Sequence, residues 1–210
     1  MKFLLFSDLH ASLEHAHKLV ELSAEADVLI GAGDFGNMRK QTADCIKVLR
    51  TVDKPAVLVP GNAESVEELR KAAEIWPSAE VLHVTGTMIQ GVSFWGLGGG
   101  VPTTPFGSWS YDFTEDEARN LLFGCPSNGI LISHSPPKGL VDLASDGKNW
   151  GSEAVLETIR SKRPKMVVCG HIHHSWRKSA NAGGTVVWNA GIACPCRTVL
   201  ERDAGSRSGI

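Results

Sequence analysis

The stretch FLLFSDLH at residues 3–10 joins four apolar residues to a polar pair, Asp8 and His10. An unbroken apolar run of this kind indicates a strand buried on both faces, because a half-exposed strand would alternate polar and apolar residues. Similar runs recur at Val28–Ile30, Val57–Val59, Ile130–Ile132 and Met166–Cys169. The alternation of these runs with helix-like segments predicts βαβ units and a mainly parallel sheet.

Helix signals lie between most of the expected strands. Two segments begin with a capping box, in which side chains satisfy backbone N–H groups at the helix start: Ser65-x-x-Glu68 and Thr114-x-x-Glu117. The other expected helices cover residues 12–24, 42–49 and 152–160. Three short runs separated by glycines predict an antiparallel meander at Val81–Val84, Thr87–Gln90 and Val92–Trp95. Two further features are a long loop at 97–113 and a C-terminal hairpin with its turn at 181–184.

The composition is that of an ordinary globular chain of 210 residues, with 21 Lys and Arg against 23 Asp and Glu. We expect one domain over residues 1–202 and a polar tail over 203–210. The balanced charge argues against a stable nucleic-acid partner, and no apolar run reaches the ~18 residues that span a membrane. Five cysteines, an odd number, favour a reducing compartment, so we expect a cytoplasmic protein. The oligomeric state stays open.

Residues that can bind a metal follow five of the expected strands. They are Asp8, His10, Asp34, Asn62, His134, His171 and His173. In an open α/β sheet, ligands bind outside the carboxyl ends of the strands. We therefore expect the fold to bring these seven side chains, distant in sequence, to one edge.

The chemistry of this set is coherent. Two carboxylates, one amide and four imidazoles offer oxygen and nitrogen donors without a thiolate, which suits manganese, iron or zinc better than calcium. Seven ligands exceed one tetrahedral site and fit two ions that share a carboxylate, ~3.5–4 Å apart in two-metal hydrolases. We expect two divalent ions, with manganese favoured over iron, zinc or nickel. Such a centre attracts phosphate anions and lowers the pKa of a bound water.

Five motifs in order resemble the calcineurin-like metallophosphoesterases: Ser7-Asp8-Leu9-His10, Gly33-Asp34, Gly61-Asn62, Ser133-His134 and Gly170-His171-Ile172-His173. Each motif alone is weak, but five with matching order and spacing over residues 8–173 are specific. The chain is most similar to small single-domain prokaryotic phosphoesterases of this superfamily. The resemblance implies an α/β fold, a sandwich of two mixed sheets flanked by helices.

The resemblance also implies a role for each matching residue. One metal would be held by Asp8, His10 and His173, a second by Asn62, His134 and His171, and Asp34 would bridge them. A metal-bridging hydroxide would attack the phosphorus of a small phosphomonoester or phosphodiester. Catalytic roles are thus implied for Asp34, Asn62 and His134, and the expected enzyme is a metal-dependent phosphoric ester hydrolase.

One position departs from the family pattern. A histidine usually follows the asparagine and is credited with protonating the leaving group or contacting the phosphate, whereas this chain has Ala63. Alanine cannot donate a proton, so loss of an alkoxide-type leaving group should suffer most.

Two other functions compete with this hypothesis. The chain could be a scaffold that keeps this fold without catalysis, and in that case it would be similar to the retromer subunit of the same fold. Scaffold relatives tend to lose metal ligands, however, and all seven are present here. It could also be a nuclease, but it has neither basic excess nor added DNA-binding elements, which leaves short nucleotides as substrates.

Several residues near the motifs have two interpretations. Phe106, Trp109 and Tyr111 in the long loop could stack on an aryl group or base, but aromatic residues more often hold a loop onto its domain. Arg39 could meet a phosphate and His174 a substrate, but both are more often solvated.

Overall fold

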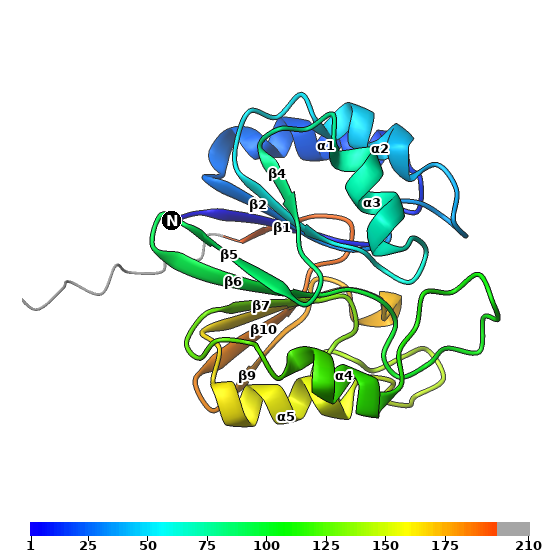
Figure 1. Cartoon of the computed structure of the whole chain (residues 1–210), viewed down its shortest axis with the longest axis vertical. Helices are drawn as coiled ribbons and strands as arrows, with labels where there is room; N and C mark the ends of the chain where they lie inside the picture. The colour runs from blue at the N-terminus through cyan, green and yellow to red at the C-terminus, as the bar shows by residue number, and fades with distance from the viewer. Residues whose placement is uncertain (197–210) are drawn as a thin grey trace, which may run out of the picture.

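Two β-sheets face each other and carry helices on both outer faces in the computed structural model, which describes residues 1–196 (Figure 1). The first sheet has the strand order β11 (Cys194–Cys196), β1 (Phe3–Phe6), β2 (Val28–Ala32), β3 (Ala56–Val59) and β4 (Ala79–Val81). The second has the order β5 (Thr85–Ile89), β6 (Val92–Leu97), β7 (Ile130–Ser133), β8 (Met166–Cys169), β10 (Thr185–Asn189) and β9 (Ser179–Ala182). The first sheet is parallel apart from its antiparallel edge strand β11, and the second has a parallel centre with antiparallel strands at both edges, which confirms the predicted sandwich of two mixed sheets.

The helices form the two outer layers. The first sheet is covered by α1 (Leu13–Leu22), α2 (Thr42–Leu49) and α3 (Val66–Ala73), and the second by α4 (Glu115–Leu122) and α5 (Glu153–Lys162) (Figure 1). Both predicted capping boxes are formed, and the side chain of Ser12 caps α1. None of the helices within residues 1–196 is long and apolar enough to cross a membrane.

Side-chain alternation along the strands divides the core into three layers. In β1, Leu4 and Phe6 pack toward α1–α3, while Phe3 and Leu5 pack between the sheets with Phe94 of β6. A third cluster lies between the second sheet and α4–α5. Strands with apolar residues on both faces are therefore explained by burial between a sheet and a helical layer.

The predicted meander is wrong in its first strand. β4 is Ala79–Val81 and pairs parallel with β3, so only β5 and β6 form an antiparallel hairpin. The reason is α3, which returns the chain from β3 to the same edge and makes a βαβ crossover that favours a parallel pair. His83, expected in a strand, lies in the connection between the sheets and accepts a hydrogen bond from the Gly98 backbone N–H.

The remaining predictions of chain organisation agree with the structure. Residues 101–113 are irregular apart from short bridges, and β9 and β10 form the hairpin around the glycine turn. The predicted tail at 203–210 lies outside the described residues.

Candidate metal centre

The seven predicted ligands come from the loops after β1, β2, β3, β7 and β8 and meet at one end of the sandwich. Four of them are buried, with exposed fractions of 1% for Asp8, 3% for Asp34, 3% for Asn62 and 0% for His134. The three others are more open, and they line a cavity of about 570 Å³ together with Asp34 and Asn62. The topology thus brings all seven side chains to one place, as the sequence predicts.

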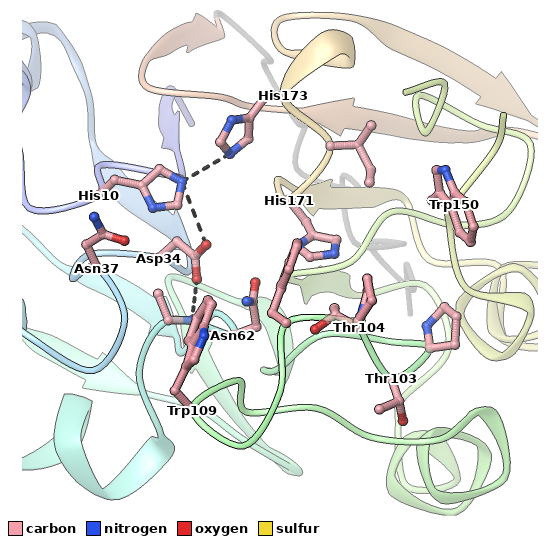
Figure 2. A pocket seen from close by; sticks show the side chains of 15 residues that line it. His10, Asp34, Asn37, Asn62, Thr103, Thr104, Trp109, Trp150, His171 and His173 are labelled. Carbon is pink, nitrogen blue, oxygen red and sulfur yellow. Dashed lines mark hydrogen bonds and ion pairs between the residues drawn. The ribbon is translucent and has the colours of Figure 1, made fainter. Parts of the chain in front are cut away.

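Three side chains form one group of metal-binding atoms: Asp8, His10 and His173. The Nε2 atoms of His10 and His173 face each other at 3.0 Å (Figure 2). The Nε2 of His173 also lies 3.7 Å from Oδ1 of Asp8. Two imidazole nitrogens directed at one point, beside a carboxylate, are the arrangement that a shared cation would stabilise.

A second group consists of Asp8, Asp34 and His134. Oδ1 of Asp34 is 3.5 Å from Nε2 of His134. Oδ2 of Asp34 is 3.8 Å from Nε2 of His10 (Figure 2). The two oxygens of Asp34 therefore face ligands assigned to different metals. Asp8 also belongs to both groups.

Asn62 and His171 complete the set on the other side of Asp34. Oδ1 of Asn62 lies 3.1 Å from Nε2 of His134, and the rings of His134 and His171 are 4.9 Å apart. The Nδ1–H of His134 donates to the Ala32 carbonyl at 2.7 Å, which turns Nε2 of the ring toward Asn62 and Asp34.

The backbone at the ligands is unusual. Asp8, His10, Asp34 and His171 all have left-handed φ, at 56°, 46°, 58° and 66°. Each such conformation costs a non-glycine residue about 1–3 kcal/mol and persists only where the surrounding structure holds it. The loops therefore turn sharply at the strand ends, and this strain concentrates at the predicted ligands.

Glycines before the ligands allow the loops to approach one another. A side chain on Gly61 would collide with the carboxylate and backbone of Asp34, and one on Gly170 would collide with Ser7 and Asp8. These atoms cannot move without displacing a predicted ligand, so only glycine leaves enough room at these two positions.

The electrostatics of the site suit a cation. Burial raises the pKa of Asp34 to about 6, and burial also raises the pKa of Glu64 to about 7. Within residues 1–196, the charged partners of Asp8 and Asp34 are histidines, with no Lys or Arg in an ion pair with either carboxylate. Buried carboxylates without a fixed cation are costly, and a divalent ion would offset that cost.

Burial and the neighbouring carboxylates shift the pKa values of the four imidazoles in different directions. Burial lowers the pKa of His171 well below its ordinary value, and burial also lowers the pKa of His10 and His173. For His134, burial acts in the same direction, but the Asp34 and Asp8 carboxylates outweigh it and raise its pKa. Neutral imidazole is the form that binds metal, so three of the four rings are already poised for it.

Two supporting residues were not identified from the sequence. Glu64 is fully buried and accepts hydrogen bonds from the backbone N–H groups of Phe35, Gly36 and Gly61, which joins the loops that carry Asp34 and Asn62. Glu64 lies two residues after the Gly61-Asn62 motif, and this position is the sequence feature that could have identified it. Trp176 donates its indole N–H to Oδ2 of Asp8 at 3.1 Å, and no local pattern announces that contact.

Two open interpretations of polar residues are resolved. Arg39 forms a 2.7 Å ion pair with Glu68 and donates to the Trp109 carbonyl, so it supports the long loop instead of lining the cavity. His174 is exposed and does not line the cavity, which agrees with its interpretation as a surface residue. Ala63 does line the cavity, and its backbone N–H donates to Oδ1 of Asp34 at 2.8 Å.

The aromatic residues of the long loop divide into two sets. Tyr111 packs edge-on against Phe113 and near His83, and so holds the base of the loop on the domain, as expected. Phe106 and Trp109 instead line the cavity and stack on each other, against the expectation that they would hold the loop. The physical reason is that neighbouring backbone bonds, including Tyr111 N–H to the Asn62 carbonyl at 2.9 Å, already fix the loop.

Comparison with known proteins adds independent information. A family model, the calcineurin-like phosphoesterase superfamily domain, matches residues 1–204. The UPF0046 protein K07C11.7 of Caenorhabditis elegans is 26% identical over 211 residues, which cover 89% of this chain and 68% of the worm protein.

Solved structures share the fold. The protein TT1561 of Thermus thermophilus matches with a TM-score of 0.72 and 19% identity, over 90% of this chain and 88% of that one. A dimetal phosphatase from Danio rerio matches with a TM-score of 0.60 and 14% identity, over 91% of this chain and 88% of that one. At these identities the similarity establishes the architecture and not the substrate.

Proposed function

The chain belongs to the calcineurin-like phosphoesterase superfamily and is a metal-dependent phosphoesterase, and on this premise we propose that it uses two divalent ions to hydrolyse a small phosphomonoester or phosphodiester. The observation that carries the dinuclear proposal is the position of Asp34, whose two oxygens face His10 on one side and His134 on the other. A carboxylate so placed can serve two ions at once.

The donor set fits that proposal. Seven oxygen and nitrogen donors are gathered around buried carboxylates that pair with no Lys or Arg among residues 1–196. We propose that one ion is held by Asp8, His10 and His173, and the other by Asn62, His134 and His171, with Asp34 between them. Two ions bound there would polarise the phosphoryl oxygens and activate a water as the nucleophile. Manganese is favoured, with iron, zinc or nickel as alternatives.

The residues of the chain have distinct tasks in this scheme. Oδ2 of Asp8 accepts hydrogen bonds from the Ser7 hydroxyl and the Trp176 indole, whereas Oδ1 accepts one from the His171 backbone N–H at 3.1 Å and faces Nε2 of His173 at 3.7 Å. The amide N–H of Asn62 donates to Ser110 Oγ at 3.0 Å, so its Oδ1 faces the site. Ala63 offers no proton to a leaving group.

A reconstitution experiment tests the proposal. Metal-free protein is loaded with Mn, Fe, Zn, Ni or Mg and assayed on panels of phosphomonoesters and phosphodiesters. We expect activity to return with manganese, to disappear in His173→Ala, and to persist in the neighbouring control His174→Ala. Tight metal binding without hydrolysis of any ester would instead support the scaffold hypothesis.

We also propose that the protein works in the cytoplasm. Three cysteines of the described chain, Cys45, Cys125 and Cys169, are free and buried, and burial raises the pKa of each thiol. Buried free thiols support a reducing environment. Measurement of free thiols in protein purified from its own cells tests this assignment.

A further inference from the structure

The cavity beside the metal ligands has a second wall that the proposed chemistry does not use. Away from the ligands it is lined by Pro102, Pro105, Phe106, Trp109, Trp150 and Ile172. In Figure 2, Trp109 and Trp150 lie on opposite sides of the pocket, with Asn62, His171 and Thr104 between them. The cavity of about 570 Å³ falls in the range of ~300–1,000 Å³ that is typical of small-molecule sites, so it has room for more than a phosphoryl group.

The aromatic side chains of this wall are exposed at a cost. Phe106 is 50% exposed and Trp150 is 48% exposed, although large apolar side chains are usually covered. Phe106 and Trp109 stack with centroids 5.7 Å apart and only 10° between their planes. A flat apolar surface is thus already assembled at the mouth of the metal site.

This wall is also held in place. Arg39 donates to the Trp109 carbonyl at 3.4 Å while it is paired with Glu68. Across the cavity, the indole N–H of Trp150 donates to the Asp146 carboxylate at 3.1 Å. The backbone of Trp109 and the ring of Trp150 are therefore held before a ligand arrives, which lowers the entropic cost of binding.

The charge of the wall limits what it accepts. None of the residues that line the cavity within the described chain is Lys or Arg. Lys148 lies 5.8 Å from the Trp150 ring centroid but does not line the cavity. A second phosphate beside the metal site would find no fixed cation, whereas an uncharged flat group would cover exposed aromatic surface.

We propose that three aromatic side chains of this lining, Phe106 and Trp109 on one side of the pocket and Trp150 on the other, bind a planar aromatic group carried by the phosphoester. These three residues are called the aromatic wall below, and the inference rests on the proposed phosphoesterase function. The substrate class is then a phosphoester with an aryl or nucleobase group next to the scissile phosphate. Aromatic stacking gives the wall its selectivity for flat groups over saturated groups of equal size.

A binding experiment on the metal-loaded protein tests the proposal without requiring turnover. Calorimetry compares methylphosphonate, benzylphosphonate and cyclohexylmethylphosphonate, since the last two are similar in size and differ in flatness. We expect benzylphosphonate to bind about 3- to 10-fold more tightly than the cyclohexylmethyl compound, as stacking predicts. Phe106→Ala, Trp109→Ala and Trp150→Ala should abolish the difference. The matched control Phe123→Ala, at a site 82% exposed and outside the cavity, should preserve it.

The outcomes separate the two hypotheses. If methylphosphonate binds and the two larger compounds bind with equal affinity, the aromatic proposal alone is overturned. The same holds if the preference for benzylphosphonate survives all three wall substitutions to alanine. Absence of binding by every phosphonate overturns the proposed function and this inference together. A parallel comparison of adenosine 5′-monophosphate with ribose 5-phosphate identifies the kind of aromatic group. Tighter binding of the nucleotide indicates a nucleobase. Equal binding of these two compounds, together with a preference for benzylphosphonate, indicates a simple aryl ester.

Discussion

Trp176 touches two predicted ligands of the same metal, because its indole N–H donates to Oδ2 of Asp8 at 3.1 Å while its ring lies 4.3 Å from the ring of His173. A residue that orients a ligand from behind fixes which atom the ligand presents, and loss of such a contact typically weakens metal binding. Trp176 is therefore a positioning residue for the site that contains Asp8.

The first prediction concerns this contact. Trp176→Phe keeps an aromatic ring beside His173 but removes the N–H, so we expect manganese affinity to fall about 10- to 100-fold. Metal titration with calorimetry measures the effect. Trp95→Phe is the matched control, because the indole nitrogen of Trp95 is buried without a hydrogen-bond partner among the described residues. Equal manganese affinity in the two variants would show that Trp176 does not position the metal ligands.

The second prediction concerns Asp34. We expect two metal ions per chain at saturation, and we expect Asp34→Asn to lower activity more than Asn62→Ala does. The reason is charge and position: the carboxylate faces both groups of ligands, and an amide is an uncharged and poor bridge. Elemental analysis and activity at saturating metal check both points. A ceiling of one ion per chain, or equal losses in the two variants, contradicts the dinuclear arrangement.

The third prediction concerns the orientation of Asn62. Ser110 accepts the amide N–H of Asn62 at 3.0 Å and donates to Asp112 at 2.9 Å, so Ser110→Ala frees the amide to rotate. We expect the affinity for one of two metal equivalents to fall by about 10-fold, with little change in thermal stability. Ser108→Ala, at an exposed serine of the same loop, serves as the control. Identical titration curves for the two variants would show that the amide is held by other means.

The fourth prediction concerns Ala63. General-acid help is worth about 10²- to 10⁴-fold, and it matters most for a strongly basic leaving group. The native protein should therefore prefer 4-nitrophenyl esters to simple alkyl esters. Ala63→His, in a residue that lines the cavity, should raise kcat/KM for alkyl esters more than for aryl esters. Metal content is measured alongside, and an unchanged ratio with high native activity on alkyl esters means that another group supplies the proton.

Much of the fold could be predicted from the sequence because its signals are local. Uniformly apolar runs located most of the buried strands, and capping boxes located the starts of α3 and α4. The parallel pairing of β4 with β3 was not predictable in the same way, since Val81 carries no mark of its partner. Strand pairing depends on which edge is free once α3 has packed, and that is a property of the assembled sheet.

The residues of the candidate site also differ in whether a local sequence pattern predicts them. The seven predicted ligands follow strand ends, so the topology gathers them as the sequence predicts, and their binding of metal stays a prediction. The contacts of Trp176 and Ser110 arise between segments that meet only in the folded chain, and neither residue type signals a metal site. The aromatic wall was underestimated for a related reason: Phe106 faces the cavity because backbone bonds elsewhere already fix its loop.

The meeting of His10 and His173, whose ring nitrogens lie 3.0 Å apart although 163 positions separate them in sequence, fixes the order of events during synthesis. Ribosomes add about 5–20 residues per second, so roughly 10 to 30 seconds pass between the two histidines. For that interval the nascent chain carries Asp8 and His10 but lacks His173, the third ligand of the proposed site. Loading of the proposed Asp8, His10 and His173 site is therefore a late step, which follows translation of nearly the whole domain and reports that β1 and the segment after β8 have met.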